Sequence, residues 1–329
     1  MKQTFNGMKL FSAIVQQIKY HMLLVLIWLI RYLPYSFVLN FFRSLGVIAW
    51  LVDPFHRKIA SIQMQAALGL KHVWYIVLKV FINQGEILVD AIRYAYMSDA
   101  EINARVEVEG KEHLDEALAS KRGIMIFMGH IGNWEILSNV PRLFGIQLCH
   151  MAELRKDPQL ESIIHEIRSR SGITFLPPKG KALMLIRELK KGRIISMMVD
   201  LRTKGKRALL CNFFGLPAIT NPGPAFIALK GNALVLPLYT VKLNGTHRIC
   251  FEKAMDPGYF GEGYDAIQAL SDFMQSWVAS IVRKHPEQWI WLYTRWLKRS
   301  DIRRIIKKKL DFKEYIHRQV EAVMSDQKK

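Results

Sequence analysis

The chain has 329 residues, half of them hydrophobic and 23% charged, which excludes a wholly disordered protein and a collagen-like or low-complexity one. This length is enough for one large domain or two smaller ones with a sizeable core. The 47 lysines and arginines exceed the 28 aspartates and glutamates by 19, so we expect anionic partners such as phospholipid headgroups, acidic proteins or nucleic acid. Three cysteines far apart in the chain indicate neither a disulfide framework nor a zinc site, and they favour a reducing compartment.

Residues 8–52 are both apolar and basic, and they favour lipid among these partners. The longest uninterrupted apolar run, Met22–Ile30, is shorter than the roughly 20 residues that a membrane-spanning helix needs. Phe11–Leu33 can still span if its charged ends reach the headgroups. The segment therefore fits a single spanning or deeply inserted helix, or amphipathic helices lying in the interface. In the interfacial case four aromatic residues lie at headgroup level, namely Trp28, Tyr32, Tyr35 and Trp50. A buried helical hairpin of a soluble protein is the third interpretation.

Basic residues flank the apolar run Met22–Ile30 on both sides. They are Lys2, Lys9, Lys19, Arg57 and Lys58, and they suit a cytoplasmic face against anionic lipid. A secretory signal is not favoured, because more hydrophobic sequence follows the run and no small-residue cleavage site follows it directly.

From about residue 121 the sequence alternates between short apolar runs and segments with helical spacing. We predict strands at Ile124–Met128, Ile146–Met151, Ile173–Leu176, Ile194–Val199 and Ala233–Val241, with an antiparallel return at Arg248–Phe251. We predict helices at Asn133–Phe144, Pro158–Arg170, Lys181–Lys191, Pro224–Lys230 and Tyr264–Lys284. Such alternation is typical of an α/β fold with a mainly parallel sheet covered by helices on both faces. The expected organisation is N-terminal hydrophobic, membrane-associated helices over 1–55, the α/β domain over 56–300 and a basic C-terminal helix over 301–329.

The segment Gly129–Glu135 follows the first predicted strand, at the carboxyl edge where α/β sheets bind their ligands. His130 lies in the turn, and Glu135 falls in the first turn of the next predicted helix, which Asn133 would cap. A carboxylate that accepts from one ring nitrogen fixes the tautomer and leaves the other nitrogen free to remove a proton from a hydroxyl. The pair thus predicts a general base for a nucleophile that the substrate supplies. If the pair is not catalytic, His130 would be a helix cap or a satisfied polar residue, and Glu135 a carboxylate that the helix dipole stabilises.

The heptapeptide Gly129-His130-Ile131-Gly132-Asn133-Trp134-Glu135 resembles the His-x4-Asp/Glu motif of the lysophospholipid acyltransferase superfamily. More narrowly, it is similar to the G-H-x-G-N-W-E block of the late acyltransferases of bacterial lipid A biosynthesis. Further blocks follow that family's order over about residues 10–300; they contain Arg155, Asp200, 212–218, 222–225, 236–237 and 286–295. The loop 201–204 after Asp200 is more basic than in the family, which leaves the exact acceptor open.

The resemblance implies transfer of a fatty acyl group from an acyl carrier protein thioester, or less often a coenzyme A thioester, to a hydroxyl of a lipid A precursor. A lysophospholipid, a glycolipid or an ornithine lipid is the alternative acceptor. His130 would be the general base and Glu135 would orient it. No cofactor and no metal is expected, because a thioester is already activated. The implied location is the cytoplasmic face of the cell inner membrane, single-pass or monotopic, in contact with membrane phospholipids.

Other residues acquire expected roles through the same resemblance. Arg155, or the backbone N–H groups of Gly132 and Asn133, are candidates for stabilising the oxyanion, and Arg155 is also a candidate for binding an acceptor phosphate. Asp200 is expected to hold Arg155 or a sugar hydroxyl, or to cap the end of its strand. An apolar slot for the acyl chain is expected from the N-terminal helices together with Phe213, Phe214 and Pro217.

Nine lysines and arginines lie between Arg295 and Lys313, among isoleucines and a leucine at helical spacing. Such a helix suits anionic lipid or an acidic carrier protein, and equally a solvated surface. Charge alone would also permit a non-catalytic membrane-binding or nucleic-acid-binding protein. Because the motifs of known RNA and DNA modules are missing and the N-terminus is apolar, we expect no nucleic-acid partner.

Overall fold

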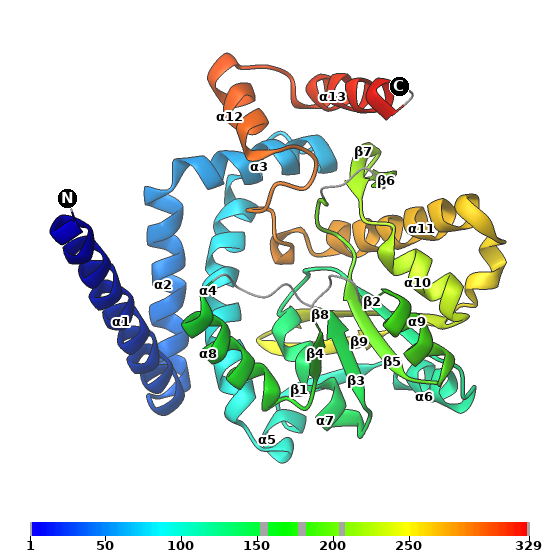
Figure 1. Ribbon diagram of the computed structural model, residues 1–329, viewed down its shortest axis with the longest axis horizontal. Helices are drawn as coiled ribbons and strands as arrows, with labels where there is room; N and C mark the ends of the chain where they lie inside the picture. Colours follow the sequence, from blue (N-terminus) through cyan, green and yellow to red (C-terminus); the bar gives the residue numbers. More distant parts are fainter. Residues whose placement is uncertain (1, 152–156, 177–181, 204–207, 328–329) are drawn as a thin grey trace.

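The computed structural model describes residues 2–151, 157–176, 182–203 and 208–327, with side chains for 14–151, 157–174, 176, 182–203 and 208–321. At its centre lies a seven-stranded sheet in the order β1-β9-β8-β2-β5-β3-β4 (Figure 1). Its strands are β1 (Val106–Glu109), β2 (Ile124–Met128), β3 (Leu148–Met151), β4 (Thr174–Leu176), β5 (Ile194–Met198), β8 (Leu234–Leu243) and β9 (Thr246–Phe251). Every pairing among them is parallel except that of β8 with β9. The predicted mainly parallel sheet and its antiparallel return are confirmed.

Hydrophobic layers cover both faces of this sheet, because successive side chains of a strand point to opposite sides. Met125 and Phe127 of β2 pack in one cluster with α9 (Ala182–Lys190), α10 (Gly223–Gly231) and α11 (Gly263–Lys284). Ile124, Ile126 and Met128 pack in another with α6 (Lys111–Ala119) and α7 (Val140–Phe144). The expected α/β architecture with helices on both faces is therefore present.

The predicted helix at Asn133–Phe144 is wrong in detail. The chain instead forms a 3₁₀ helix, η1 (Trp134–Asn139), followed by the short α7. Pro141 explains the break, because its ring has no N–H and clashes with the carbonyl four residues earlier. Sequence analysis also missed β1 and a hairpin of β6 (Leu209–Phe213) and β7 (Leu216–Thr220).

Five helices precede β1 in the described part of the chain. After α1 (Lys2–Tyr32) they are α2 (Tyr35–Val52), α3 (Pro54–Leu68), α4 (Trp74–Tyr96) and α5 (Asp99–Asn103). α2 lies directly on α4, since a Cβ on Gly46 would come within 2.7 Å of the Phe81 carbonyl oxygen. α1 stands at the edge of the molecule beyond α2 (Figure 1). The remaining helical segments are α8 (Pro158–Ser169), η2 (Pro257–Phe260), η3 (Pro286–Gln288), α12 (Arg299–Lys308) and α13 (Phe312–Gln327).

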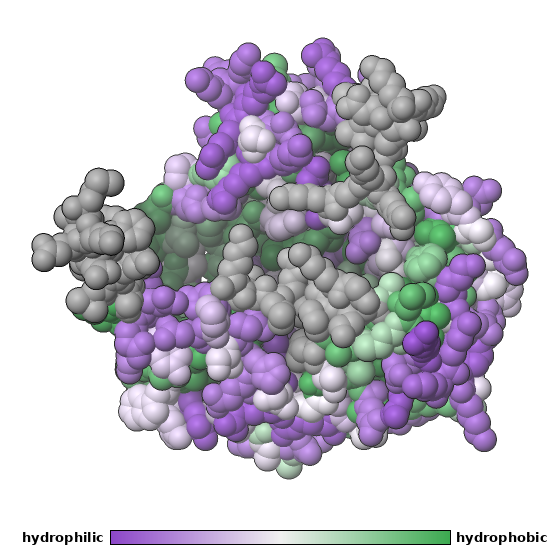
Figure 2. Space-filling model, in the orientation of Figure 1, coloured by the Kyte–Doolittle hydropathy of each residue, from purple (hydrophilic) through white to green (hydrophobic). Residues whose placement is uncertain are grey.

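Two of these N-terminal helices are long and apolar enough to cross a membrane, at Ile14–Tyr32 and Tyr35–Val52. Only 11% and 22% of these windows are buried, which argues against a hairpin enclosed in a soluble core. Figure 2 shows hydrophobic residues exposed in the region of α1 and α2, at the left of the view. These helices suggest membrane association, and the choice between spanning and interfacial anchoring stays a prediction.

Candidate active site

The parallel register of β2 and β5 brings His130 and Asp200 together. Met128 at the end of β2 lies opposite Met198 at the end of β5. His130 and Asp200 each follow two residues later, so both emerge at the same level of the carboxyl edge. The chain then turns at Gly132, whose φ is +59° and where a Cβ would lie 2.2 Å from the Thr240 carbonyl oxygen. Only glycine fits this turn, which fixes the path of the loop behind His130.

Asp200 is fully buried and holds His130 through two hydrogen bonds. Its Oδ1 lies 2.7 Å from His130 Nδ1, and its Oδ2 accepts from the His130 backbone N–H at 2.8 Å. Oδ2 also accepts from the indole N–H of Trp289 at 2.8 Å. Burial disfavours the charge of Asp200, but the neighbouring His130 and these hydrogen bonds outweigh it and hold the pKa of the carboxyl below its usual range. An ionised Asp200 can only accept, so Nδ1 of His130 carries the proton and Nε2 is left as the basic nitrogen.

Glu135 does not make the expected contact with His130. Its carboxylate instead forms an ion pair with Arg168 of α8, with Oε1 2.7 Å from Nη2 and Oε2 3.3 Å from Nε. The physical reason is that η1 is a 3₁₀ helix and that α8 places a cation beside it. The carboxylate that orients His130 in the structure is therefore Asp200, for which sequence analysis expected other partners.

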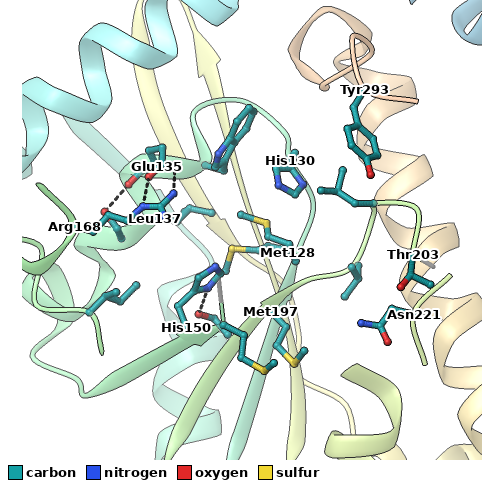
Figure 3. Close-up of a pocket in the computed structure, with 18 of the residues that line it drawn as sticks. Met128, His130, Glu135, Leu137, His150, Arg168, Met197, Thr203, Asn221 and Tyr293 are labelled. Carbon is teal, nitrogen blue, oxygen red and sulfur yellow. Dashed lines mark hydrogen bonds and ion pairs between the residues drawn. The ribbon is translucent and has the colours of Figure 1, made fainter. Parts of the chain in front are cut away.

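His130 faces a cavity of about 400 Å³ that also contains Glu135 and Arg168 (Figure 3). Much of the remaining wall is apolar and rich in methionine, with Met128, Leu137, Met151, Ile173, Met197, Met198 and Val199. Arg202 and Tyr293 also line it. The cavity therefore combines an imidazole, two cations and an apolar surface, which suits a substrate with both a polar and a hydrocarbon part.

His150 is a second histidine in this cavity that sequence analysis missed. Its Nδ1 lies 2.8 Å from Ser196 Oγ. Burial, helped by the charge of Arg168, lowers the pKa of His150 to about 4, so its ring is neutral near pH 7. Its position at the carboxyl end of a predicted parallel strand was a usable signal, whereas nothing in the local sequence of α8 indicates that Arg168 reaches the same cavity.

Of the expected oxyanion or phosphate donors, the Gly132 N–H is the one that the structure shows to be already paired. The Gly132 N–H donates to the Gln288 carbonyl oxygen at 2.8 Å and is therefore occupied. Asn133 is 2% exposed and lines a separate cavity of about 20 Å³ beside Asp90 and Lys242, and the role of its backbone N–H stays a prediction. Arg155 lies outside the described residues.

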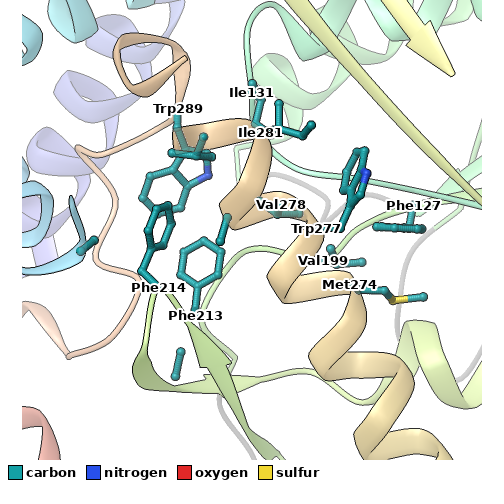
Figure 4. Packing of buried hydrophobic residues seen from close by; sticks show 14 of the residues in the cluster. Phe127, Ile131, Val199, Phe213, Phe214, Met274, Trp277, Val278, Ile281 and Trp289 are labelled. Carbon is teal, nitrogen blue, oxygen red and sulfur yellow. The ribbon is translucent and has the colours of Figure 1, made fainter. Parts of the chain in front are cut away.

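The expected acyl slot around Phe213, Phe214 and Pro217 does not coincide with the His130 cavity. Pro217 lies in β7, and Phe213 and Phe214 are buried in the core. There Phe213 packs against Trp289 (Figure 4), with 5.5 Å between the ring centroids. Its ring centroid is also 5.5 Å from that of Trp296. Both phenylalanines lie at the turn of the β6–β7 hairpin, and the packing of this hairpin already buries their side chains. Within the described part of the chain, the apolar wall facing His130 comes from the methionine-rich strands instead.

The chain is similar in sequence to known acyltransferases. Over 205 residues the chain is 25% identical to the phosphatidylinositol mannoside acyltransferase of Mycobacterium tuberculosis (strain CDC 1551 / Oshkosh), covering 58% of this chain but only 60% of that relative. Over 281 residues it is 24% identical to the lipid A biosynthesis lauroyltransferase of Escherichia coli (strain K12), covering 84% of this chain and 90% of the relative.

Among solved structures, the 1-acyl-sn-glycerophosphate acyltransferase PlsC from Thermotoga maritima aligns with a TM-score of 0.38 and 15% identity, covering 75% of this chain and 99% of that one. The profile of the family described as bacterial lipid A biosynthesis acyltransferase matches residues 8–298. This match covers most of the 329 residues, and the chain therefore belongs to the bacterial lipid A biosynthesis acyltransferase family.

Proposed function

We propose that the protein is an O-acyltransferase that moves a fatty acyl group from a thioester to a hydroxyl of a membrane lipid. The observation that carries this proposal is the buried Asp200 that holds Nδ1 of His130 while the ring faces the cavity. The base accepts a proton from a hydroxyl that the substrate brings, which is the requirement of acyl transfer to a lipid. Membership of the family supports the same reaction class.

The chemistry balances without an added cofactor. Nε2 of His130 takes the hydroxyl proton as the lipid oxygen attacks the carbonyl carbon of the thioester. The tetrahedral intermediate collapses, the carbon–sulfur bond breaks, and the thiolate leaves with the proton from the imidazolium. Asp200 stays ionised throughout and stabilises the transient positive charge on the ring.

The other groups of the cavity have proposed roles in binding. The methionine-rich wall holds the acyl chain, because methionine side chains adapt to irregular apolar ligands. Arg202 contacts an anionic group of the acceptor, and the Glu135–Arg168 pair shapes the polar side of the cavity. Arg155 keeps its proposed role at the oxyanion or at a phosphate.

The proposed donor is acyl carrier protein, with acyl coenzyme A as the alternative. A lipid A precursor is the favoured acceptor, because the family and the Escherichia coli relative are named for lipid A. The mycobacterial relatives favour a glycolipid acceptor as the second candidate. The proposed location is the cytoplasmic face of the inner membrane, and the apolar helices α1 and α2 support membrane association.

The test combines a variant with lipid analysis. A strain that lacks the gene is complemented with the wild type or with His130→Ala, and its lipids are compared by mass spectrometry. We expect a mass difference of one acyl group that the wild type restores and His130→Ala does not, with equal amounts of both proteins in the membrane fraction. Restoration of the acylated lipid by His130→Ala would exclude His130 as the base.

A further inference from the structure

A cationic surface formed by α12, the residues that cap it and Lys313 of α13 lies beside the C-terminal end of α2. It consists of eight exposed basic residues, namely Lys298, Arg299, Arg303, Arg304, Lys307, Lys308, Lys309 and Lys313. The same stretch contains only two acidic residues, Asp301 and Asp311. Ile302 and Ile305 anchor the helix, with 0% and 2% exposed. Within the described part of the chain, no ion pair joins any of the eight to a carboxylate.

Direct contacts fix the position of this cationic surface. The guanidinium groups of Arg299 and Arg303 lie over the ring of Phe55, 5.1 and 5.2 Å from its centroid. Arg299 Nη2 is also 2.6 Å from His56 Nε2. Phe55 and His56 are in the first turn of α3, which begins two residues after α2 ends at Val52. The basic helix is thereby placed at the C-terminal end of α2.

An apolar stripe runs along the outer face of α2 toward the same end. Its members recur every three or four residues and are between 40% and 72% exposed; they are Phe37, Phe41, Leu45, Ile48 and Val52. An apolar stripe that inserts below the headgroups, with cations where it ends, is the arrangement by which interfacial helices bind anionic bilayers. Figure 2 shows the hydrophilic region over α12 at the top of the view.

We propose that the cationic surface of α12 binds the anionic phospholipid headgroups of the bilayer that receives the stripe of α2. A membrane is favoured over an acidic protein partner because the stripe and the cations adjoin one another. A soluble acidic partner would cover the cations and leave the apolar stripe in water. This surface is separate from the His130 cavity, so its test does not depend on the proposed reaction.

The test measures binding of the full-length protein to vesicles by flotation. Vesicles of phosphatidylcholine alone are compared with vesicles containing 30% phosphatidylglycerol, a fraction of roughly physiological anionic charge. The variant is Arg304→Gln/Lys307→Gln/Lys308→Gln. The matched control, Lys121→Gln/Lys190→Gln/Lys191→Gln, removes three exposed charges near the opposite edge of the sheet, where β2 and β5 begin.

We expect the α12 variant to lose at least tenfold in affinity for the anionic vesicles, since each basic residue near such a surface contributes roughly fivefold. The control should stay within about twofold of the wild type, and binding to neutral vesicles should be unchanged in both. Equal affinity of the α12 variant and the control for anionic vesicles would overturn the proposal. So would a loss that affects only binding of acyl carrier protein while vesicle binding is retained.

A second inference concerns Trp289 and rests on the proposed function. Its indole is 1% exposed, and its Nε1 donates to the Asp200 oxygen that does not contact the His130 ring. Ile131, next to His130, also forms a β-bridge with Trp289. Both contacts fix the position of the Asp200 carboxylate relative to the His130 imidazole. We infer that Trp289 is a positioning residue, which directs Oδ1 of Asp200 at Nδ1 of His130 and reduces the basicity of the carboxylate.

Trp289→Phe tests this role, with Trp291→Phe as the matched control. Trp291 is equally buried and lies 4.6 Å from Trp289 between ring centroids, but its Nε1 donates to the Pro286 carbonyl oxygen. A carboxylate without the indole donor attracts the ring proton more strongly, so the acid limb of the kcat profile should move to higher pH in Trp289→Phe alone.

We also expect kcat of Trp289→Phe to fall about tenfold or more below that of the control, which is the scale of one charge-assisted hydrogen bond. Equal kcat and equal acid limbs in the two variants would refute the positioning role. Activity retained by His130→Ala would instead refute the proposed function, so the two failures can be told apart.

Discussion

Asp200→Asn is the substitution that distinguishes the observed pairing of His130 from the one its sequence suggests. The three groups that contact Asp200 are all N–H donors: the His130 backbone, the His130 ring and the Trp289 indole. An amide offers one oxygen and one NH2 group in place of two accepting oxygens. Placed where Oδ2 lies, the amide oxygen still accepts from the backbone N–H and the indole.

The NH2 group of that amide then faces His130 Nδ1, which has to become an acceptor. The ring proton moves to Nε2, and the nitrogen that faces the substrate loses its lone pair. We therefore expect kcat to fall by about 10²–10⁴-fold, the usual contribution of a general base, with little change in KM. Folding should survive, because all three buried donors and acceptors of this cluster remain paired.

Glu135→Gln is the matched control, since it makes the same carboxylate-to-amide change in the same cavity. The Glu135–Arg168 pair is partly solvated, with 24% and 23% of the side chains exposed, and such a pair contributes about 0–1 kcal/mol. We expect kcat within about tenfold of the wild type, because Asp200 and not Glu135 accepts from the His130 ring. An assay of acyl transfer from a radiolabelled thioester measures both variants. Full activity in Asp200→Asn with none in Glu135→Gln would refute the assignment of Asp200 and restore the sequence-based pairing.

Three further outcomes follow from burial. Between pH 6.5 and about 4 the unfolded chain binds a proton at His150 and the folded protein does not, because the pKa of the buried ring is lowered to about 4. The free energy of unfolding should therefore fall by about 3 kcal/mol on acidification through that window. Denaturant titrations at several pH values should show a weaker dependence of this free energy on pH in His150→Asn. Phe213→Ala should lower the free energy of unfolding by about 3–5 kcal/mol, measured by denaturation, without altering acyl chain length in product mass spectra. Met198→Phe narrows the cavity and should shift the products toward shorter chains, since each excluded CH2 forfeits about 0.8 kcal/mol.

Local sequence was sufficient to place the strands that build the site. Ile124–Met128 is a strand with the predicted bounds, and the predicted Ile194–Val199 differs from β5 by one residue. A strand that is buried on both faces of a sheet consists of consecutive apolar residues, so it can be recognised in the sequence alone. The helix predicted at Asn133–Phe144 was wrong in detail because Pro141 interrupts it, although the apolar spacing around this residue is helical.

The partner of His130 could not be found in the same way. The pairing with Asp200 joins residues 70 positions apart and depends on β2 and β5 being neighbours in the sheet. Strand order is not recorded in any local pattern, whereas Glu135, five residues from His130, is an obvious candidate in the sequence. Chemistry was expected at the carboxyl ends of the strands, and the polar residues at or just past these ends include His130, Asp200 and His150.

The residues proposed for the chemistry and those proposed for the choice of substrate lie in different parts of the fold. His130 and Asp200 are set by the register of two central strands and by buried contacts with Trp289. Arg168 and Arg202, in contrast, come from α8 and from the loop after β5, where substitutions do not disturb the central strands. Acceptor preference can therefore change through the cations of the cavity while the base stays in place. Arg202→Ala should accordingly alter the acceptor KM far more than kcat, which kinetics with varied acceptor would show.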